Sequence, residues 1–372
     1  VGYKGWIQID FVRLSPVSLK CEYVSRQDIL GNHKHNCDCE ETKPKPFSLQ
    51  AVGVDNLKYG IRMVETNAPD DKVNDIVSLV THATVDRLKT VAFALSQWGA
   101  ESAATVAIYN EARNGSEDVL EKLESFLRGY GLSLNSLRST RIIIVEANAN
   151  ELYPINAIRN IAINYTTTPY ALLVDADIIP SSNCKQEITN ILQSDFFKEE
   201  RDKNALVIPV FEDNLAVHQE SLFKAYIKRS RSKVNLKSLV KKRVFSIYKS
   251  NNQPRAHAAT DYDRWWESSE PYQIEYESQY EPFVVVKVNN NPLLPHFDSR
   301  FVGYGWNKVS FIFDLHSAGF KFHVLPNSWL IHRTHQKTKY SLAFAASPTT
   351  RIKNRAIRFE WLIDNRNDVI CR

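Results

Sequence analysis

Four β-type runs alternate with three helical segments between residues 76 and 174, and this alternation limits the folds open to the chain. The third run, Arg141–Val145, is apolar after its arginine, which is typical of a strand buried on both faces of a parallel sheet. The order predicts an α/β domain with a doubly wound, Rossmann-like sheet. The expected strands are Ile76–Val80, Ala104–Ile108, Arg141–Val145 and Tyr170–Val174, and the expected helices are Val85–Trp98, Glu117–Leu127 and Pro154–Tyr165.

Several classes of protein are disfavoured by what the sequence lacks. It has no G-x-G-x-x-G and no G-x-x-x-x-G-K-[ST] motif, which argues against a conventional dinucleotide fold and a P-loop ATPase. No apolar run approaches the roughly 18 residues that would span a bilayer. Because hydrophobic residues make up 43% of the chain, it has enough apolar surface for a sizeable core.

The charge of the chain gives only a weak indication of its partners. Lys and Arg exceed Asp and Glu by 47 − 42 = 5, and nine Lys or Arg fall within residues 224–243. A solvated basic helix or loop explains this run, and the alternative is attraction of an acidic glycan or sugar. Nucleic acid is not expected as a partner, because no nucleic-acid-binding motif accompanies the run.

Residues 1–70 read as an irregular N-terminal extension or stem-proximal segment, with the folded domain expected over 71–372. Cys37 and Cys39 stand beside two histidines, so a small zinc site is one reading. A disulfide that involves Cys21, Cys37 or Cys39 is preferred if the protein is secretory, because the spacing departs from that of common zinc sites. The chain starts with Val, so we expect that a leader, anchor or stem once preceded it.

An acidic pair, Asp175 and Asp177, directly follows the apolar run Leu172–Val174. Side chains at i and i+2 of an extended chain point to one side, and ligands of open α/β sheets bind beyond the carboxyl ends of the strands. Two carboxylates held there repel each other unless a cation lies near them, and a hard divalent cation suits oxygen ligands. The alternative is a surface loop with two aspartates.

A polar face precedes this pair. Asn156, Arg159 and Asn160 are spaced i, i+3 and i+4, so they share one side of the expected helix. This face either contacts a ribose or phosphate of a ligand or is simply solvated.

Two histidines, His332 and His335, follow the apolar run Trp329–Ile331. They are either structural residues or metal ligands. As ligands beside carboxylates, they would favour manganese over magnesium.

A series of longer motifs accompanies these residues along the chain. They are Tyr153–Asn160, Thr168–Tyr170, Asp175–Asp177, His257–Thr260, Tyr280–Val286, Phe297–Lys308 and Val324–His335. In this order they resemble glycosyltransferase family 49, from about Asp75 to about Leu362. Several long motifs in one order are more specific than a single Asp-x-Asp.

The resemblance implies a single catalytic domain of GT-A type, with a nucleotide-binding half at 71–180 and an acceptor-binding half at 181–372. It implies metal-dependent, inverting transfer from a UDP-sugar, with Mn²⁺ or Mg²⁺ as cofactor and UDP-glucuronic acid as the expected donor, since known members use it. The acceptor would be a glycan or glycoprotein. The protein would reside in the Golgi lumen as a type II membrane protein whose anchor lies outside this chain. No oligomeric state follows from the sequence.

The resemblance and the expected sheet order together assign roles to particular residues. Asp177 and His332 would bind the metal, with His335 as the alternative histidine. Asp175 would bind ribose, metal or both. The end of the first strand, at Thr81 and His82, would meet the nucleotide; this position follows from the sheet order and the GT-A architecture.

The sequence departs from the family pattern at two places. The histidine motif commonly reads His-Met-Pro-His, whereas Arg333-Thr334 stand between the histidines here. Many inverting GT-A enzymes carry an acidic residue after a Gly-aromatic-Gly turn, but Asn307 follows Gly303–Trp306. The general base that inversion requires must therefore be one of three other acidic residues, which are Glu281, Asp298 and Asp314.

Two other functions remain open at this point. One is a carbohydrate-binding protein that kept the fold and lost turnover, which the missing acidic residue would explain. The other is a phosphoesterase that uses the same carboxylates and a metal.

Overall fold

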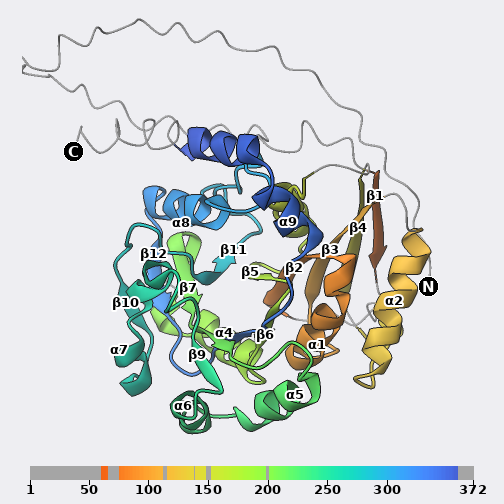
Figure 1. The fold of residues 1–372 in the computed structure, drawn as a ribbon. Helices are drawn as coiled ribbons and strands as arrows, with labels where there is room; N and C mark the ends of the chain where they lie inside the picture. The colour runs from red at the N-terminus through yellow and green to blue at the C-terminus, as the bar shows by residue number, and fades with distance from the viewer. Residues whose placement is uncertain are drawn as a thin grey trace, which may run out of the picture.

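One large sheet dominates the part of the chain that the computed structural model describes, residues 60–65, 75–111, 115–137, 139–147, 152–197 and 201–358. Figure 1 shows its arrangement. In spatial order the nine strands are β1 (Gly60–Glu65), β4 (Thr140–Ala147), β3 (Ala104–Glu111), β2 (Val77–Thr84), β5 (Tyr170–Asp175), β11 (Phe283–Lys287), β7 (Asn204–Ile208), β12 (Lys321–Val324) and β10 (Tyr272–Ile274).

Strands β2 to β5 form the parallel half of this sheet, as expected. The helices between them are α1 (Leu88–Trp98), α2 (Ser116–Arg128) and α3 (Ile155–Asn164). The chain order reverses at β2, since β3 and β4 lie on one side of it and β5 on the other. Ligands of open α/β sheets bind at such a reversal. The α/β fold class and the Rossmann-like order are confirmed.

A second, four-stranded sheet begins where β5 ends. In spatial order it contains β6 (Ile178–Pro180), β13 (Leu330–His332), β8 (Val210–Asp213) and β9 (Phe245–Ile247). His332 lies opposite Ile178 on one side and opposite Glu212 on the other. This small sheet therefore brings the segment after the acidic pair next to the segment that carries the histidines.

Further helices surround the second half of the chain. They are α4 (Cys184–Gln193), α5 (Glu220–Arg229), α6 (Lys233–Lys241), α7 (Tyr262–Glu267), α8 (Asn307–Ser317) and α9 (Lys339–Ala345). The buried apolar residues of α8 are Val309, Phe311, Ile312 and Leu315. The ring of Phe297 stacks on Phe311, whereas Phe313 is partly buried and His316 is exposed.

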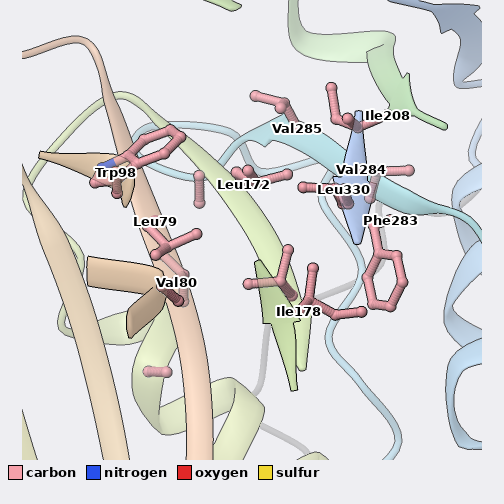
Figure 2. Packing of buried hydrophobic residues seen from close by; sticks show 14 of the residues in the cluster. Leu79, Val80, Trp98, Leu172, Ile178, Ile208, Phe283, Val284, Val285 and Leu330 are labelled. Atoms are coloured by element: carbon pink, nitrogen blue, oxygen red, sulfur yellow. The ribbon is translucent and has the colours of Figure 1, made fainter. Parts of the chain in front are cut away.

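The two sheets share one hydrophobic core. Figure 2 shows Leu79 of β2, Leu172 of β5 and Val284 of β11 in the same cluster as Ile178 of β6 and Leu330 of β13. All five side chains are at most 2% exposed. Burying a side chain of this size contributes about 1.5–3 kcal/mol to stability. The shared core thereby fixes the small sheet, and with it the histidines, against the carboxyl end of β5.

The expected boundary of the N-terminal extension needs a correction. Strand β1 falls within residues 1–70, yet it pairs with β4 along its whole length, so the sheet already includes residues 60–65. The zinc or disulfide reading of Cys37 and Cys39 falls outside the described residues. Within them, Cys184 is a buried free thiol, and no helix combines the length and apolar character needed to cross a membrane.

Candidate functional site

The ends of β2 and β5 bring His82 and Asp175 side by side. The two residues are partners in the parallel register, and Nε2 of His82 lies 3.2 Å from Oδ1 of Asp175. Nδ1 of the same ring lies 2.6 Å from the hydroxyl of Tyr153. Burial lowers the pKa of His82, so we expect a neutral ring that links these two groups through hydrogen bonds.

Two cations hold Asp175. Arg159 donates to Oδ1 at 2.6 Å, and Nζ of Lys308 donates to Oδ2 at 3.1 Å. Burial opposes ionisation of this carboxyl group, but the charges of Lys308 and Arg159 outweigh it and hold the pKa of Asp175 well below its usual range. Both oxygens thus have protein partners, and Asp175 lies beside the group of potential metal ligands rather than within it.

Asp177 and the two histidines form that group, which we call the Asp177 triad. Oδ2 of Asp177 lies 2.8 Å from Nε2 of His335 and 3.6 Å from Nε2 of His332. One potential ligand atom from each residue lies within 4.8 Å of the others. Burial opposes ionisation of Asp177, but the histidines lower its pKa far below the usual range. One carboxylate and two imidazoles, each with an atom that can bind a metal, therefore lie together beside the small sheet.

The chemistry of the Asp177 triad fits a divalent transition metal. Imidazole and carboxylate together suit Mn²⁺, whereas Mg²⁺ prefers oxygen ligands alone. Nδ1 of His335 lies 2.9 Å from the carbonyl of Gln336. In the tautomer that donates this bond, Nε2 keeps a free lone pair beside Asp177, which is the usual arrangement behind a metal-bound histidine. The residues present therefore fit a cation with both histidines among its ligands.

Asp213, at the end of β8, anchors the pair of residues between the histidines. Arg333 donates to its Oδ1 at 2.9 Å, and the N–H of Thr334 donates to its Oδ2 at 2.7 Å. The N–H of Arg333 also donates to the carbonyl of Asp177 at 2.8 Å. Arg333 and Thr334, which differ from the family pattern, are thus held in place by hydrogen bonds, and both histidines still lie beside Asp177.

A groove of about 930 Å³ opens beside the triad, with His335 in its wall. The groove lies at the carboxyl ends of β2 and β3, where Thr84 and Tyr109 line it. Arg87 also lines the groove and donates to the carbonyl of Gln336 at 2.9 Å, and its Nη2 lies 2.8 Å from Nδ1 of His335. The groove's basic side chains outnumber its acidic ones, which favours anionic ligands, although Lys89 and Lys224 are paired with Glu220 and Lys339 with Glu111. The basic ones are Arg87, Lys89, Lys122, Lys224, Arg333, Lys337 and Lys339, and the acidic ones are Asp86, Glu111 and Glu220.

Asn156, Asn160 and Thr81 were expected to contact the nucleotide, but all three are buried. Asn156 donates to the carbonyl of Asp298 at 2.8 Å, and Asn160 forms two hydrogen bonds with the backbone of Phe297. Thr81 lines a small, mainly apolar cavity. The polar face of α3 is therefore neither solvated nor open to a ligand at these asparagines; they brace residues 297–298 instead.

The three candidates for the general base occupy different surroundings. Glu281 accepts from Nζ of Lys249 at 2.7 Å and lies close enough to Tyr248, beside His332, to act on it electrostatically. Asp298 is paired with Arg300 inside its own turn, at 2.7 Å. Asp314 acts on Tyr276, which contacts Phe313 and His316 on the outer side of α8. Of the three, Glu281 is the one connected to the triad, through Tyr248.

Sequence reasoning missed Glu212, Asp213 and Tyr248. Burial raises the pKa of Glu212, which faces His332 across the small sheet, and burial together with nearby carboxylates raises that of Tyr248. The run Ala205–Phe211 is apolar, apart from Pro209, and ends in Glu212-Asp213, the same signal that marked Asp175. That signal could have identified the two acidic residues, whereas nothing in the local sequence marked Tyr248.

These features define an α/β protein with a basic, nucleotide-sized groove and a three-residue group of potential metal ligands at the switch point of its sheet. Comparison with protein families then identifies the class of enzyme. The chain belongs to the family described as glycosyl-transferase for dystroglycan, whose model matches residues 133–361. The expected glycosyltransferase membership is thereby confirmed.

Individual relatives agree with this family. The glycosyltransferase-like protein gnt14 of Dictyostelium discoideum is 34% identical over 73% of this chain and 39% of its own length. The xylosyl- and glucuronyltransferase LARGE2 of Rattus norvegicus is 31% identical over 87% of this chain and 42% of its own. The chain thus spans about two fifths of the length of these relatives. Among solved structures, S. aureus TarS with UDP-GlcNAc matches 71% of this chain and 60% of its own at 12% identity, with a TM-score of 0.38.

Proposed function

We propose that this chain catalyses a metal-dependent, inverting transfer of glucuronic acid from UDP-glucuronic acid to a hydroxyl of a glycan or glycoprotein. The observation that carries the proposal is the Asp177 triad beside the basic groove, at the reversal point of the sheet. Family membership supports the reaction class, and the rat relative, named as a xylosyl- and glucuronyltransferase, supports the donor.

The groove would bind the UDP part of the donor. Arg87 and Lys337 would contact phosphate oxygens, because they line the same wall as His335. A divalent cation held by the Asp177 triad would neutralise charge on the diphosphate leaving group, so no protein acid is required. Asp175, held in place by Arg159 and Lys308, would accept hydrogen bonds from hydroxyl groups of the donor.

Glu281 is the proposed general base for the acceptor hydroxyl. It is partly buried and acts on Tyr248, which contacts His332 of the triad, so an acceptor bound beside Tyr248 would deliver its proton to the carboxylate. Glu212 is the second acidic residue in this area. Asp298 and Asp314 are less suited, since one is engaged in its own turn and the other acts on Tyr276.

The cellular setting rests on the family resemblance. We propose the Golgi lumen, with residues before the sheet serving as a stem-proximal segment and an anchor outside this chain. The oligomeric state forms no part of the proposal.

A panel of UDP-sugars tests the function. Wild type and Asp177→Asn are mixed with Mn²⁺ and UDP, UDP-glucose, UDP-xylose or UDP-glucuronic acid, and both the melting temperature and UDP release to a glycan acceptor are measured. We expect the greatest stabilisation with UDP-glucuronic acid, by mass action, and release that disappears in the variant. Binding without release would indicate a carbohydrate-binding protein, and hydrolysis of simple phosphoesters would indicate a phosphoesterase. If UDP-glucuronic acid raises the melting temperature no more than UDP does, the assignment of UDP-glucuronic acid as the donor is wrong.

A further inference from the structure

The ring of Tyr248 lies between two histidines at the end of β9. Its centroid is 4.6 Å from that of His332, a member of the Asp177 triad, and 5.2 Å from that of His257. The backbone N–H of Tyr248 donates to the carbonyl of Val210 at 3.2 Å, and this bond connects the residue to β8 of the small sheet. The ring is therefore held in a defined place beside the potential metal ligands.

The hydroxyl of Tyr248 has no hydrogen-bond partner within the described part of the chain, and the residue is partly buried. Asp177, Glu212 and Glu281 lie near enough to act on it electrostatically, but no hydrogen bond joins them to it. On the other side of the ring, Nε2 of the buried His257 also lacks a partner among the described residues. A tyrosine hydroxyl that no protein group engages and that solvent can reach is available to a ligand, both as a donor and as an acceptor.

Tyr248 and the basic groove adjoin different histidines of the triad. His335 forms part of the groove wall, whereas His332 contacts Tyr248. Neither Tyr248 nor its neighbours Lys249 and Glu281 line the groove. If UDP occupies the groove with its diphosphate at the triad, the group attached to the diphosphate extends past the triad toward Tyr248.

We propose that Tyr248 binds the sugar that is transferred, and that its hydroxyl donates a hydrogen bond to an oxygen of that sugar. This inference rests on the proposed function and adds the residue that contacts the donor sugar rather than the nucleotide. The sugar would lie against Tyr248 while UDP lies in the groove, and Glu281 would stand on the sugar side of the triad, where the acceptor must arrive.

The substitution Tyr248→Phe tests the proposal, because it removes the hydroxyl and keeps the ring that contacts both histidines. Affinities of wild type and variant for UDP, UDP-glucose and UDP-glucuronic acid are measured by calorimetry in the presence of Mn²⁺. We expect the variant to bind the preferred UDP-sugar about fivefold more weakly, as for loss of one hydrogen bond, and to bind UDP as wild type does. Tyr276→Phe, on the outer side of α8, is the matched control and should change neither affinity.

The outcomes separate the inference from the proposed function. Equal weakening of UDP and UDP-sugar in Tyr248→Phe would overturn the inference, since it would mean that the residue only supports His332. Unchanged affinity for the UDP-sugar would overturn it as well, and so would a wild type that binds no UDP-sugar more tightly than UDP. A wild type that fails to bind UDP with Mn²⁺ would instead overturn the proposed function.

Discussion

Arg333 and Asp213 form an ion pair with 2.9 Å between Nη1 and Oδ1, and this pair lies directly behind the two histidines of the Asp177 triad. Asp213 is 2% exposed and also accepts from the backbone of Thr334. The spacing of the histidines is therefore set by a residue on another strand. Groups that orient metal ligands in this way commonly affect metal affinity as strongly as some ligands do.

We expect Asp213→Asn to weaken Mn²⁺ binding by about 10- to 100-fold, because the loop between the histidines loses its charged anchor. The variant should also be less stable, since Arg333 keeps its buried charge without the partner. Calorimetric titration with Mn²⁺ measures the first effect and thermal unfolding the second. Asp263→Asn, at an exposed position of α7, is the control. Wild-type Mn²⁺ affinity in Asp213→Asn would contradict the anchoring role.

The two aspartates of the acidic pair should differ in their effect on metal binding. Asp177→Asn removes the carboxylate of the triad and should abolish stabilisation by Mn²⁺ in the absence of nucleotide. Asp175→Asn should retain that stabilisation, because the oxygens of Asp175 are bound by Arg159 and Lys308. Melting curves with and without Mn²⁺ compare the two variants. Loss of the Mn²⁺ effect in both would show that Asp175 is itself a ligand.

In the metal-free protein, the contact between His335 and Asp177 should make stability depend on pH. Burial would lower the pKa of His335, but its hydrogen bond to Asp177 and the charge of that residue outweigh burial and raise the pKa above 6.5. A histidine whose pKa is higher in the folded state stabilises the fold fully below the unfolded pKa, and this contribution is lost as pH rises through the folded pKa.

We therefore expect His335→Gln to lower the melting temperature more at about pH 5.5 than at about pH 8.5, with chelator present to remove metal. Thermal unfolding at both pH values measures the difference. A decrease that is equal at the two pH values, or larger at the alkaline one, would argue against the ion pair.

Gly303 and Gly305 should respond differently to the same substitution. Both have left-handed backbones, with φ of +70° and +88°, so alanine costs about 1–2 kcal/mol at either position. At Gly303 the new Cβ would also meet Cδ2 of Phe344 at 2.5 Å, whereas nothing lies within 4 Å at Gly305. We expect Gly303→Ala to be less stable than Gly305→Ala by about 1–3 kcal/mol in urea unfolding. Equal stabilities would mean that Phe344 moves aside without cost.

Substitution of the base candidates should separate Glu281 from Asp314. Glu281→Gln is expected to lower kcat by about 10²- to 10⁴-fold with little change in donor affinity, because only proton removal from the acceptor is lost. Asp314→Asn should leave kcat unchanged, since Asp314 acts on Tyr276 on the outer side of α8. Single-turnover transfer from UDP-glucuronic acid measures both. Full activity of Glu281→Gln would show that another group removes the proton, and Glu212 would be the next candidate.

Local patterns were sufficient to predict the parallel half of the sheet. Apolar runs such as Arg141–Val145 and helices with one apolar stripe depend on the chain within a few residues, and the order of elements limits how they can pack. The acidic pair and the histidine motif were visible for the same reason. Each follows an apolar strand, and strand ends of such sheets meet at one edge.

Only the tertiary structure decided which polar residues share a site. Asp213 ends β8 and Tyr248 directly follows β9, both distant in the sequence from Asp177, and the register of the small sheet brings them together. The same packing buried Asn156 and Asn160 against residues 297–298, although their helical spacing was equally compatible with solvent. Sequence periodicity determines which residues share a face of one element, but the partner of that face is selected by the burial of apolar surface across the whole domain.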